Sequence, residues 1–214
     1  RLVDELLDGH GSDPEITAMV EGLEIWVNPL HNPDGTYFGG DSSVSSAIRE
    51  YTTASGGYGA DLNRNFPDPA DGPHPDGEPY WLETQTMMDF AASRHFVIAA
   101  NFHGGAEVVN YPWDTWARLH SDNDLLVNVS RAYADYAHAD GPANYMTDLD
   151  DGITNGYAWY RLTGGRQDFV TYWHGCREAT IEVSSDKMPA SSEMPTFWTA
   201  NRRALHGWLN EALE

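Results

Sequence analysis

The sequence predicts an α/β fold in which a mixed, largely parallel twisted sheet is flanked by helices. Apolar runs of strand length alternate along the chain with longer segments whose apolar residues recur at helical spacing, and this alternation is typical of such folds. A chain of 214 residues can bury one substantial core. Because no internal repeat or linker divides it, we expect residues 1–214 to form one domain.

Four helices are expected. The chain opens on residues 1–7, which are amphipathic at helical spacing and have no capping residue before them, as in the back half of a helix whose front lies upstream. This helix should end near Gly9. Further helices are expected at residues 79–94, 122–138 and 195–213. The apolar side chains expected to face inward from the second and third helices are Trp81, Met87, Met88, Ala91, Leu125, Leu126, Val129, Ala132, Tyr133 and Tyr136.

Three apolar segments predict strands. Residues 23–29 predict a buried strand, and residues 179–183 predict a second one near the end of the chain. Residues 96–102 form an apolar run of the kind found in strands that are buried on both faces.

Three other segments predict loops. Residues 36–60 are rich in Gly, Ser, Thr and Ala, and residues 68–77 contain three prolines. Residues 140–175 are rich in Gly, Tyr and Trp and are expected to be irregular. Loops of such length inside compact domains are usually functional or mobile.

The charge balance excludes some partners. The chain has 12 basic and 33 acidic residues and a net charge of −21, which argues against nucleic acid and anionic membranes. The charge would steer cationic substrates toward the protein, although it could equally serve solubility. No apolar run approaches the roughly 20 residues that a membrane span needs. The lone Cys176 excludes an intrachain disulfide, and of the compartments it leaves open we favour a secreted or periplasmic location over the cytoplasm.

Residues 61–67, Asp-Leu-Asn-Arg-Asn-Phe-Pro, are the most informative segment. The planar guanidinium of Arg64 suits a carboxylate bidentately, and Asn63 can add an amide donor beside it. Taken alone, the segment could equally be a surface turn with a solvated arginine.

Three more motifs accompany this segment. Asn-Pro-Asp-Gly at residues 32–35 lies upstream, and Asn-Phe-His-Gly-Gly at 101–105 and Thr-Ile-Glu-Val at 180–183 lie downstream. In this order and at this spacing, the set resembles the zinc metallocarboxypeptidases of the funnel-shaped α/β type, from about Gly9 to the last helix. It is most similar to their regulatory branch, which removes Lys or Arg from peptide C-termini. The resemblance implies a Zn²⁺ cofactor and peptide or protein C-termini as partners.

His103 and Glu182 both fall at the ends of predicted strands, where ligands gather in open α/β sheets. A neutral imidazole followed by two glycines is a good zinc ligand, although a lone histidine more often only hydrogen-bonds at a strand end. Desolvation among apolar neighbours would raise the pKa of Glu182 toward that of a general base. The alternatives are an edge-strand glutamate that faces water, and Glu178 as the base in its place.

The resemblance implies specific catalytic roles. His103 would be the third zinc ligand, and the other two, from a His-x-x-Glu motif, are expected upstream of Arg1. Glu182 would be the general base, and Asp61 would orient the missing zinc histidine. Arg49 would stabilise the oxyanion. The chain has extra residues between Arg49 and Asp61, so a solvated loop arginine is the alternative at Arg49.

The resemblance also implies binding roles. Asn63, Arg64 and Tyr160 would hold the substrate's terminal carboxylate. Asp114 and Gln167 fit the pocket that selects a basic side chain in the regulatory branch.

Three features leave this assignment open. Tyr157 and Trp159 are close enough to Tyr160 for an error of register. Glu107 stands where an apolar residue is expected, and Arg166 could neutralise part of the pocket.

The sequence therefore predicts a zinc-dependent exopeptidase that removes a C-terminal residue, by its resemblance Lys or Arg. One alternative is a non-catalytic domain that binds peptide C-termini without zinc. Another is a related zinc hydrolase that acts on acylated amino acids or cell-wall peptides, because a carboxylate clamp serves any free carboxylate.

Overall fold

A four-stranded mixed sheet forms the centre of the computed structural model, which describes residues 1–44, 47–52 and 58–213. The strand order is β3-β6-β4-β5. The pairs β3–β6 and β4–β5 are parallel, and the pair β4–β6 is antiparallel. The predicted fold class is therefore confirmed. The strands are β3 (Ile98–His103), β4 (Ala106–Tyr111), β5 (Ile153–Asn155) and β6 (Arg177–Ser184).

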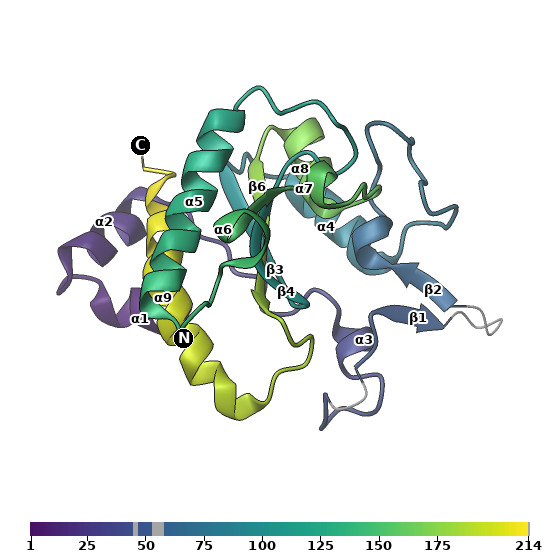
Figure 1. The fold of residues 1–214 in the computed structure, drawn as a ribbon. Coiled ribbons are helices and arrows are strands. Elements are labelled where there is room, and N and C mark those ends of the chain that lie inside the picture. Colours follow the sequence, from purple (N-terminus) through teal and green to yellow (C-terminus); the bar gives the residue numbers. More distant parts are fainter. Residues whose placement is uncertain (45–46, 53–57, 214) are drawn as a thin grey trace.

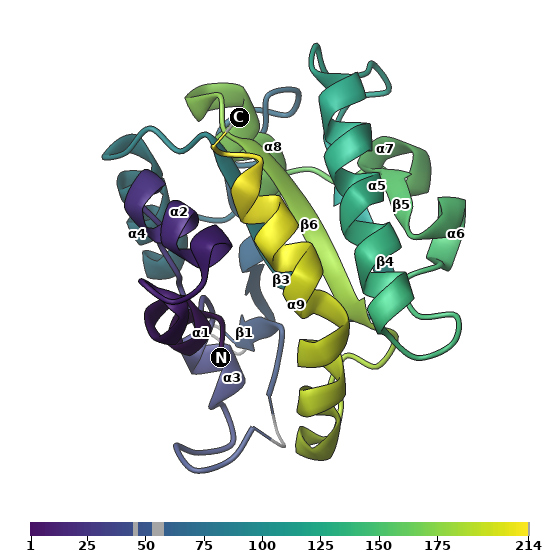
Figure 2. The same cartoon turned by 90° about the vertical axis from the view of Figure 1, so that its left-hand side faces the viewer.

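Helices cover both faces of this sheet. Figures 1 and 2 show α5 and α9 side by side over one face, with α4, α7 and α8 on the other side. These helices are α4 (Leu82–Ala92), α5 (Asn123–Asp140), α7 (Gly156–Trp159), α8 (Arg166–His174) and α9 (Met194–Asn210).

Two apolar clusters fill the space between the sheet and these helices. The larger cluster lies between the sheet, α5 and α9 and includes Tyr133, Ile181 and Trp208. The second joins α4 to α8 through Met87 and Phe169, with Phe66 from the Asn-Arg-Asn segment between them. The segment with the carboxylate-binding motif is thus anchored to the core by its own aromatic residue.

Two short helices, α1 (Leu2–Gly9) and α2 (Pro14–Gly22), lie beside α9 (Figure 2). The end predicted for the first helix is confirmed. The second helix was not predicted, although its start carries a clear signal. The Asp13 carboxylate accepts hydrogen bonds from the backbone N–H groups of Glu15 and Ile16, and Pro14 occupies the first helical position.

Several short elements complete the fold. In the predicted loop 36–60, the structure instead forms a small antiparallel pair, β1–β2, while residues 45–46 and 53–57 of that loop lie outside the described residues. The remaining elements are α3 (Pro33–Thr36), β1 (Glu50–Thr52), β2 (Tyr58–Asp61), η1 (Leu62–Arg64), α6 (Asp148–Asp151) and η2 (Ser191–Glu193).

The predictions for residues 79–94, 122–138, 179–183 and 195–213 are confirmed by α4, α5, β6 and α9. The prediction that residues 140–175 are irregular is wrong, because β5, α7 and α8 lie within them. Within α5, Leu125 and Tyr136 were expected to face inward but are 44% and 39% exposed.

The strand predicted at residues 23–29 is wrong, and so is the burial predicted for residues 96–102. Residues 23–29 have no regular secondary structure and pair with no strand in the described part of the chain. Trp26 is 48% exposed and packs its ring edge-on against Phe90 of α4. Strand β3 is the edge of the sheet, so Phe102 is 51% exposed rather than covered on both faces. None of the helices among the described residues combines the length and apolarity needed to cross a membrane.

Candidate active site

The parallel strands β3 and β6 bring His103 and Glu182 together, because these two residues are partners in the strand register. Glu182 is buried, and its Oε2 atom has no hydrogen-bond partner. Burial raises the pKa of Glu182 to about 6, against the opposing effects of Arg49 and Lys187. A buried carboxylate with a free oxygen and a raised pKa is suited to accept a proton.

The imidazole of His103 is neutral. Burial and, to a smaller extent, the nearby charge of Arg49 lower the pKa of His103 to about 4. The next two residues are glycines, and the backbone N–H of Gly105 donates to the carbonyl of Ser184 at 2.7 Å. This bond holds the turn after β3 against the end of β6, which fixes His103 beside Glu182.

A cavity of about 20 Å³ lies at these strand ends. It has room for about one water but not for an amino-acid side chain, so it has to open before a peptide residue can enter. Among the nine residues predicted for the site, Asp61, Arg64 and Gln167 do not line the cavity. The lining residues are Arg49, Asn63, His103, Asn110, Asp114, Trp159, Tyr160, Leu162, Thr180 and Glu182.

Asp61 joins the two arginines of the site. Its Oδ2 atom accepts a hydrogen bond from Arg49 Nε at 2.5 Å and lies 3.8 Å from Arg64 Nη1. Its Oδ1 atom accepts the backbone N–H of Asn63 at 2.9 Å. The carboxylate therefore holds Arg49 at the cavity and lies close to Arg64 behind it, while it caps the turn that carries Asn63.

The amide of Asn63 is held in one orientation. Its Oδ1 atom accepts the backbone N–H of Arg166 at 3.0 Å, which leaves its Nδ2 group available as a donor. The neighbouring Gly164 has φ +70°, and a Cβ there would lie 2.1 Å from the carbonyl oxygen of Arg64. Only glycine fits between the motif and the start of α8.

Tyr160 lies at the end of α7 and lines the cavity. Its ring is 45% exposed and packs edge-on against Trp159 at 5.0 Å. A half-exposed phenol at the mouth of the cavity has freedom to move toward a bound group. Tyr157 does not line the cavity, whereas Trp159 does.

Asp114 is a buried carboxylate at the floor of the site. It is 3% exposed, and its Oδ1 atom accepts a hydrogen bond from Asn110 Nδ2 at 2.9 Å. Its backbone N–H donates to Asp168. Burial raises the pKa of Asp114 to about 6. Burial, together with the charge of Asp114, also raises the pKa of Asp168. Asn110 was missed from the sequence, although its place on β4 is four residues before Asp114.

Gln167 and Glu178 are both fully buried behind the cavity rather than on its wall. Neither amide atom of Gln167 has a hydrogen-bond partner in the structure. Glu178 accepts hydrogen bonds from Arg166 Nη2 at 2.9 Å and from Asn101 Nδ2 at 2.8 Å. Glu178 is therefore engaged in a buried ion pair, which makes it a poorer candidate than Glu182 for a base.

Asn65 was also missed as a structural residue of the motif. It is fully buried, donates to Asp76 Oδ2 at 2.8 Å and accepts the backbone N–H of Trp81 at 2.9 Å. These bonds tie the motif to the loop before α4. The second asparagine of Asn-Arg-Asn thus supports the site from behind.

The described residues offer only part of a zinc site. A catalytic zinc normally has three protein ligands. His103 suits one of these positions because it is neutral, but no group of three or more His, Cys, Asp or Glu side chains that could hold a metal occurs in the part of the chain that the structure describes.

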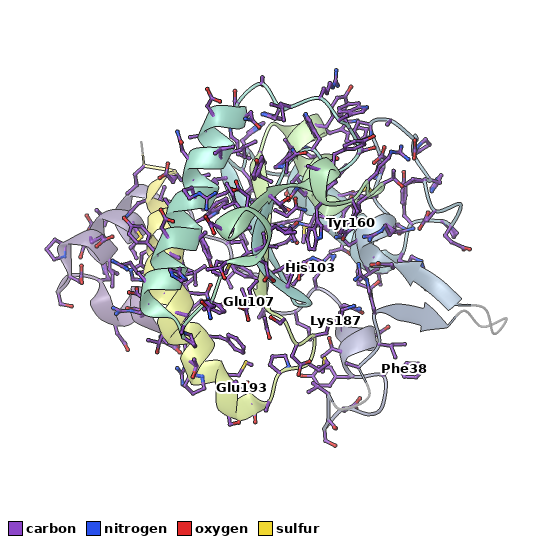
Figure 3. The ribbon with its side chains drawn as sticks, in the orientation of Figure 1. Phe38, His103, Glu107, Tyr160, Lys187 and Glu193 are labelled. Atoms are coloured by element: carbon purple, nitrogen blue, oxygen red, sulfur yellow. The ribbon has the colours of Figure 1, made fainter. Side chains whose placement is uncertain are left out.

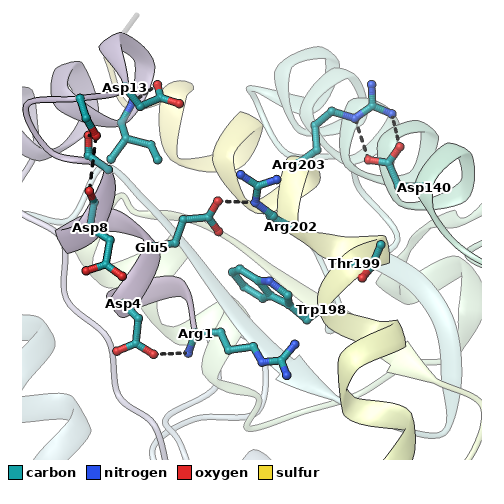
Figure 4. A pocket seen from close by; sticks show the side chains of 13 residues that line it. Arg1, Asp4, Glu5, Asp8, Asp13, Asp140, Trp198, Thr199, Arg202 and Arg203 are labelled. Carbon is teal, nitrogen blue, oxygen red and sulfur yellow. Dashed lines mark hydrogen bonds and ion pairs between the residues drawn. The ribbon is translucent and has the colours of Figure 1, made fainter.

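A larger hollow of about 1100 Å³ lies elsewhere, between α1 and α9 (Figure 4). None of the residues predicted for the active site lines it. Its charged side chains largely pair with one another, as Arg202 does with Glu5 and Arg203 with Asp140. We therefore place the candidate active site at the smaller cavity beside His103.

A histidine and a buried glutamate at the strand ends of an α/β sheet, with arginine and asparagine donors beside them, are typical of hydrolytic enzymes that recognise a free carboxylate. The family model described as zinc carboxypeptidase matches residues 1–204 of this sequence. The chain belongs to this family.

Curated relatives agree with this assignment. The chain is 33% identical to carboxypeptidase M of Mus musculus over 224 residues, which cover 98% of this chain and 48% of the mouse protein. It is 32% identical to carboxypeptidase D of Drosophila melanogaster, with 97% of this chain and 16% of the fly protein covered. The chain thus spans about half the length of the first relative and a smaller part of the second.

Solved structures share the fold. Thrombin activatable fibrinolysis inhibitor matches 98% of this chain and 56% of its own, with a TM-score of 0.75 and 18% identity. Carboxypeptidase A of Helicoverpa armigera matches 87% of this chain and 51% of its own, with a TM-score of 0.64 and 19% identity.

Proposed function

We propose that this chain forms the substrate-binding and general-base part of a zinc-dependent exopeptidase that removes C-terminal Lys or Arg from peptides. The observation that carries the proposal is the cavity at the strand ends, where His103, Glu182 and Asn63 meet the buried Asp114. Relatives named carboxypeptidase M and carboxypeptidase D support the exopeptidase activity.

Glu182 would accept a proton from the attacking water through Oε2 and pass it to the leaving amine nitrogen. Arg49, which lies at the same cavity, would stabilise the negative charge that develops on the carbonyl oxygen. When bound, zinc would polarise the scissile carbonyl and acidify a water. His103 would hold one zinc position, and two further ligands would have to come from outside the described residues.

Asn63, Arg64 and Tyr160 would hold the terminal carboxylate, which restricts cleavage to the last residue. Peptides with an amidated C-terminus should bind at least about tenfold more weakly than the free acid, because the donors of Asn63, Arg64 and Tyr160 would lose their ionised partner. The test is calorimetric titration of matched free-acid and amidated peptides, together with their kcat/KM in zinc-loaded protein. Equal affinity for acid and amide would contradict the proposal.

A second candidate is a domain that binds peptide C-termini without catalysis. The incomplete zinc-ligand set among the described residues favours it. The same titration separates the two, because a binder would discriminate acid from amide without zinc and would cleave neither peptide after zinc is added.

Asp114 would select a basic side chain. Burial raises the pKa of this carboxyl, so on lowering the pH it gains a proton earlier than an ordinary aspartate and loses the charge that attracts Lys or Arg. The preference for C-terminal Arg over Leu, measured as a ratio of kcat/KM, should therefore fall as the pH is lowered. An Asp114→Asn variant should show a low ratio that does not change with pH. A ratio that stays high at low pH in the unmodified protein would exclude this role.

A further inference from the structure

Lys187, the only lysine in the sequence, lies just past the strand that carries Glu182. Its side chain runs along the turn that follows His103. A Cβ atom built on Gly105 would lie 3.1 Å from Lys187 Cε and 3.6 Å from Cγ, so the aliphatic stem covers this glycine. The stem is therefore held beside the catalytic strand ends, while the ammonium extends beyond it.

The charge of Lys187 is not neutralised locally. The side chain is exposed, and no carboxylate of the described residues lies within 4.0 Å of its ammonium. By contrast, Arg49, Arg166 and Arg177 all have carboxylate partners. The ammonium is thus free to bind an external anion.

The position of Lys187 relates it to a definite part of the substrate. Figure 3 shows His103 between Tyr160 on one side and Lys187 on the other. Tyr160 shares the cavity with His103, whereas Lys187 touches the turn after His103. If the terminal carboxylate lies on the Tyr160 side, the peptide before the scissile bond leaves the site toward Lys187.

We propose that Lys187 is a specificity-determining residue that binds an acidic side chain of the substrate next to the scissile bond, at the penultimate residue. This inference rests on the proposed function. The enzyme would then prefer peptides whose last residue is basic and whose penultimate residue is acidic. In an otherwise strongly acidic protein, an acidic penultimate residue would be repelled without this lysine.

The competing explanation is a solvated lysine that acts only on Glu182. The positive charge of Lys187 lowers the pKa of Glu182, so its loss would change catalysis for every peptide equally. Binding measured on two peptides that differ only at the penultimate residue separates the two roles, since a change confined to Glu182 would not alter their affinity ratio.

The probes are acetylated Ala-Glu-Arg and Ala-Gln-Arg peptides, titrated calorimetrically against the whole chain, Lys187→Gln and Lys187→Arg. The unmodified chain should bind the Glu peptide roughly twofold to fivefold more tightly, as expected for an exposed ion pair. The preference should disappear in Lys187→Gln, remain in Lys187→Arg, and shrink at about 0.5 M salt. Arg118→Gln is the matched control, because Arg118 stacks on Trp116 and has no carboxylate within 4.0 Å among the described side chains.

Equal affinities of the unmodified chain for the two peptides would overturn the inference. So would a preference that survives in Lys187→Gln, or one that Arg118→Gln removes equally. The ratio of the affinities for the free-acid and amidated forms of the Ala-Gln-Arg peptide is measured alongside and tests the proposed function separately. A normal acid-to-amide ratio with no effect of Lys187 would leave the proposed function standing and remove only this inference.

Discussion

Replacement of Glu182 by glutamine is expected to lower kcat for a peptide ending in Arg by about 10²–10⁴-fold, while the affinity for the peptide changes little. Glutamine has nearly the same shape but cannot accept the proton of the attacking water. The pKa of Glu182 is raised, and its unpartnered Oε2 atom singles it out among the buried carboxylates of the site. The measurement is product release by zinc-loaded protein, with the dissociation constant of the peptide determined by calorimetry.

Glu107→Gln is the control for this substitution. Glu107 lies on the neighbouring strand β4, and its carboxylate accepts hydrogen bonds from Ser185 rather than facing the cavity. It therefore removes one negative charge nearby without touching the proposed base. Unchanged kcat in Glu182→Gln, or an equal loss in Glu107→Gln, would show that Glu182 is not the base.

The sequence predicted the elements that carry the site because their signals are local. His103 and Glu182 each end an apolar strand, and the long helices α5 and α9 are periodic over many residues. Periodicity over such a length outweighs the ambiguity of a short apolar run. These are the elements on which the fold class depends.

The predictions of secondary structure and burial were wrong where these properties depend on contacts with distant segments rather than on the local sequence. Residues 23–29 have the composition of a strand, but a strand requires a paired backbone, and the described chain provides none. The apolar run before His103 likewise indicated burial on both faces, yet β3 is an edge and Phe102 is half exposed. Helix α8 was missed because it is short, is flanked by Gly165 and Gly175, and contains Tyr and Trp residues that also occur in loops.

The residues that support the site through hydrogen bonds could also not be predicted from the sequence. Asn110 and Asn65 act through hydrogen bonds to residues that the fold brings close, and an asparagine alone gives no sign of its partner. Arg166 was considered only as a residue that could neutralise part of the specificity pocket, whereas the structure shows it in an ion pair with the buried Glu178. Long-range polar pairs of this kind have no periodic signal.

The second large expected effect is a loss of stability when the ion pair between Arg166 and the buried Glu178 is broken. Arg166→Met is expected to lower the free energy of unfolding by about 3–5 kcal/mol, because it leaves the Glu178 carboxylate buried without its cation. Glu178 is fully buried and keeps only the hydrogen bond from Asn101. With a total stability of about 5–15 kcal/mol typical of domains, the variant should be close to unfolding. The measurement is urea unfolding of the variant and the unmodified chain.

Arg177→Met is the matched control. Arg177 pairs with Asp122 at 2.7 Å, but both side chains are more than a third exposed, at 38% and 34%. Water can replace this partner, so the loss should be at most about 1 kcal/mol. An equal decrease in the free energy of unfolding of the two variants would mean that the burial of Glu178 does not determine the effect of Arg166→Met.

The stability of a double variant, and the dependence of stability on pH, both test whether the buried charge of Glu178 causes the loss. Arg166→Met combined with Glu178→Gln should recover most of the lost stability, since the amide can still accept a hydrogen bond from Asn101 without a buried charge. Burial already raises the pKa of Glu178, and the loss of Arg166 would raise it further. In Arg166→Met, Glu178 then binds its proton more tightly in the folded than in the unfolded chain. The stability deficit should therefore shrink as the pH is lowered and be largest above the folded-state pKa, where the carboxylate is ionised.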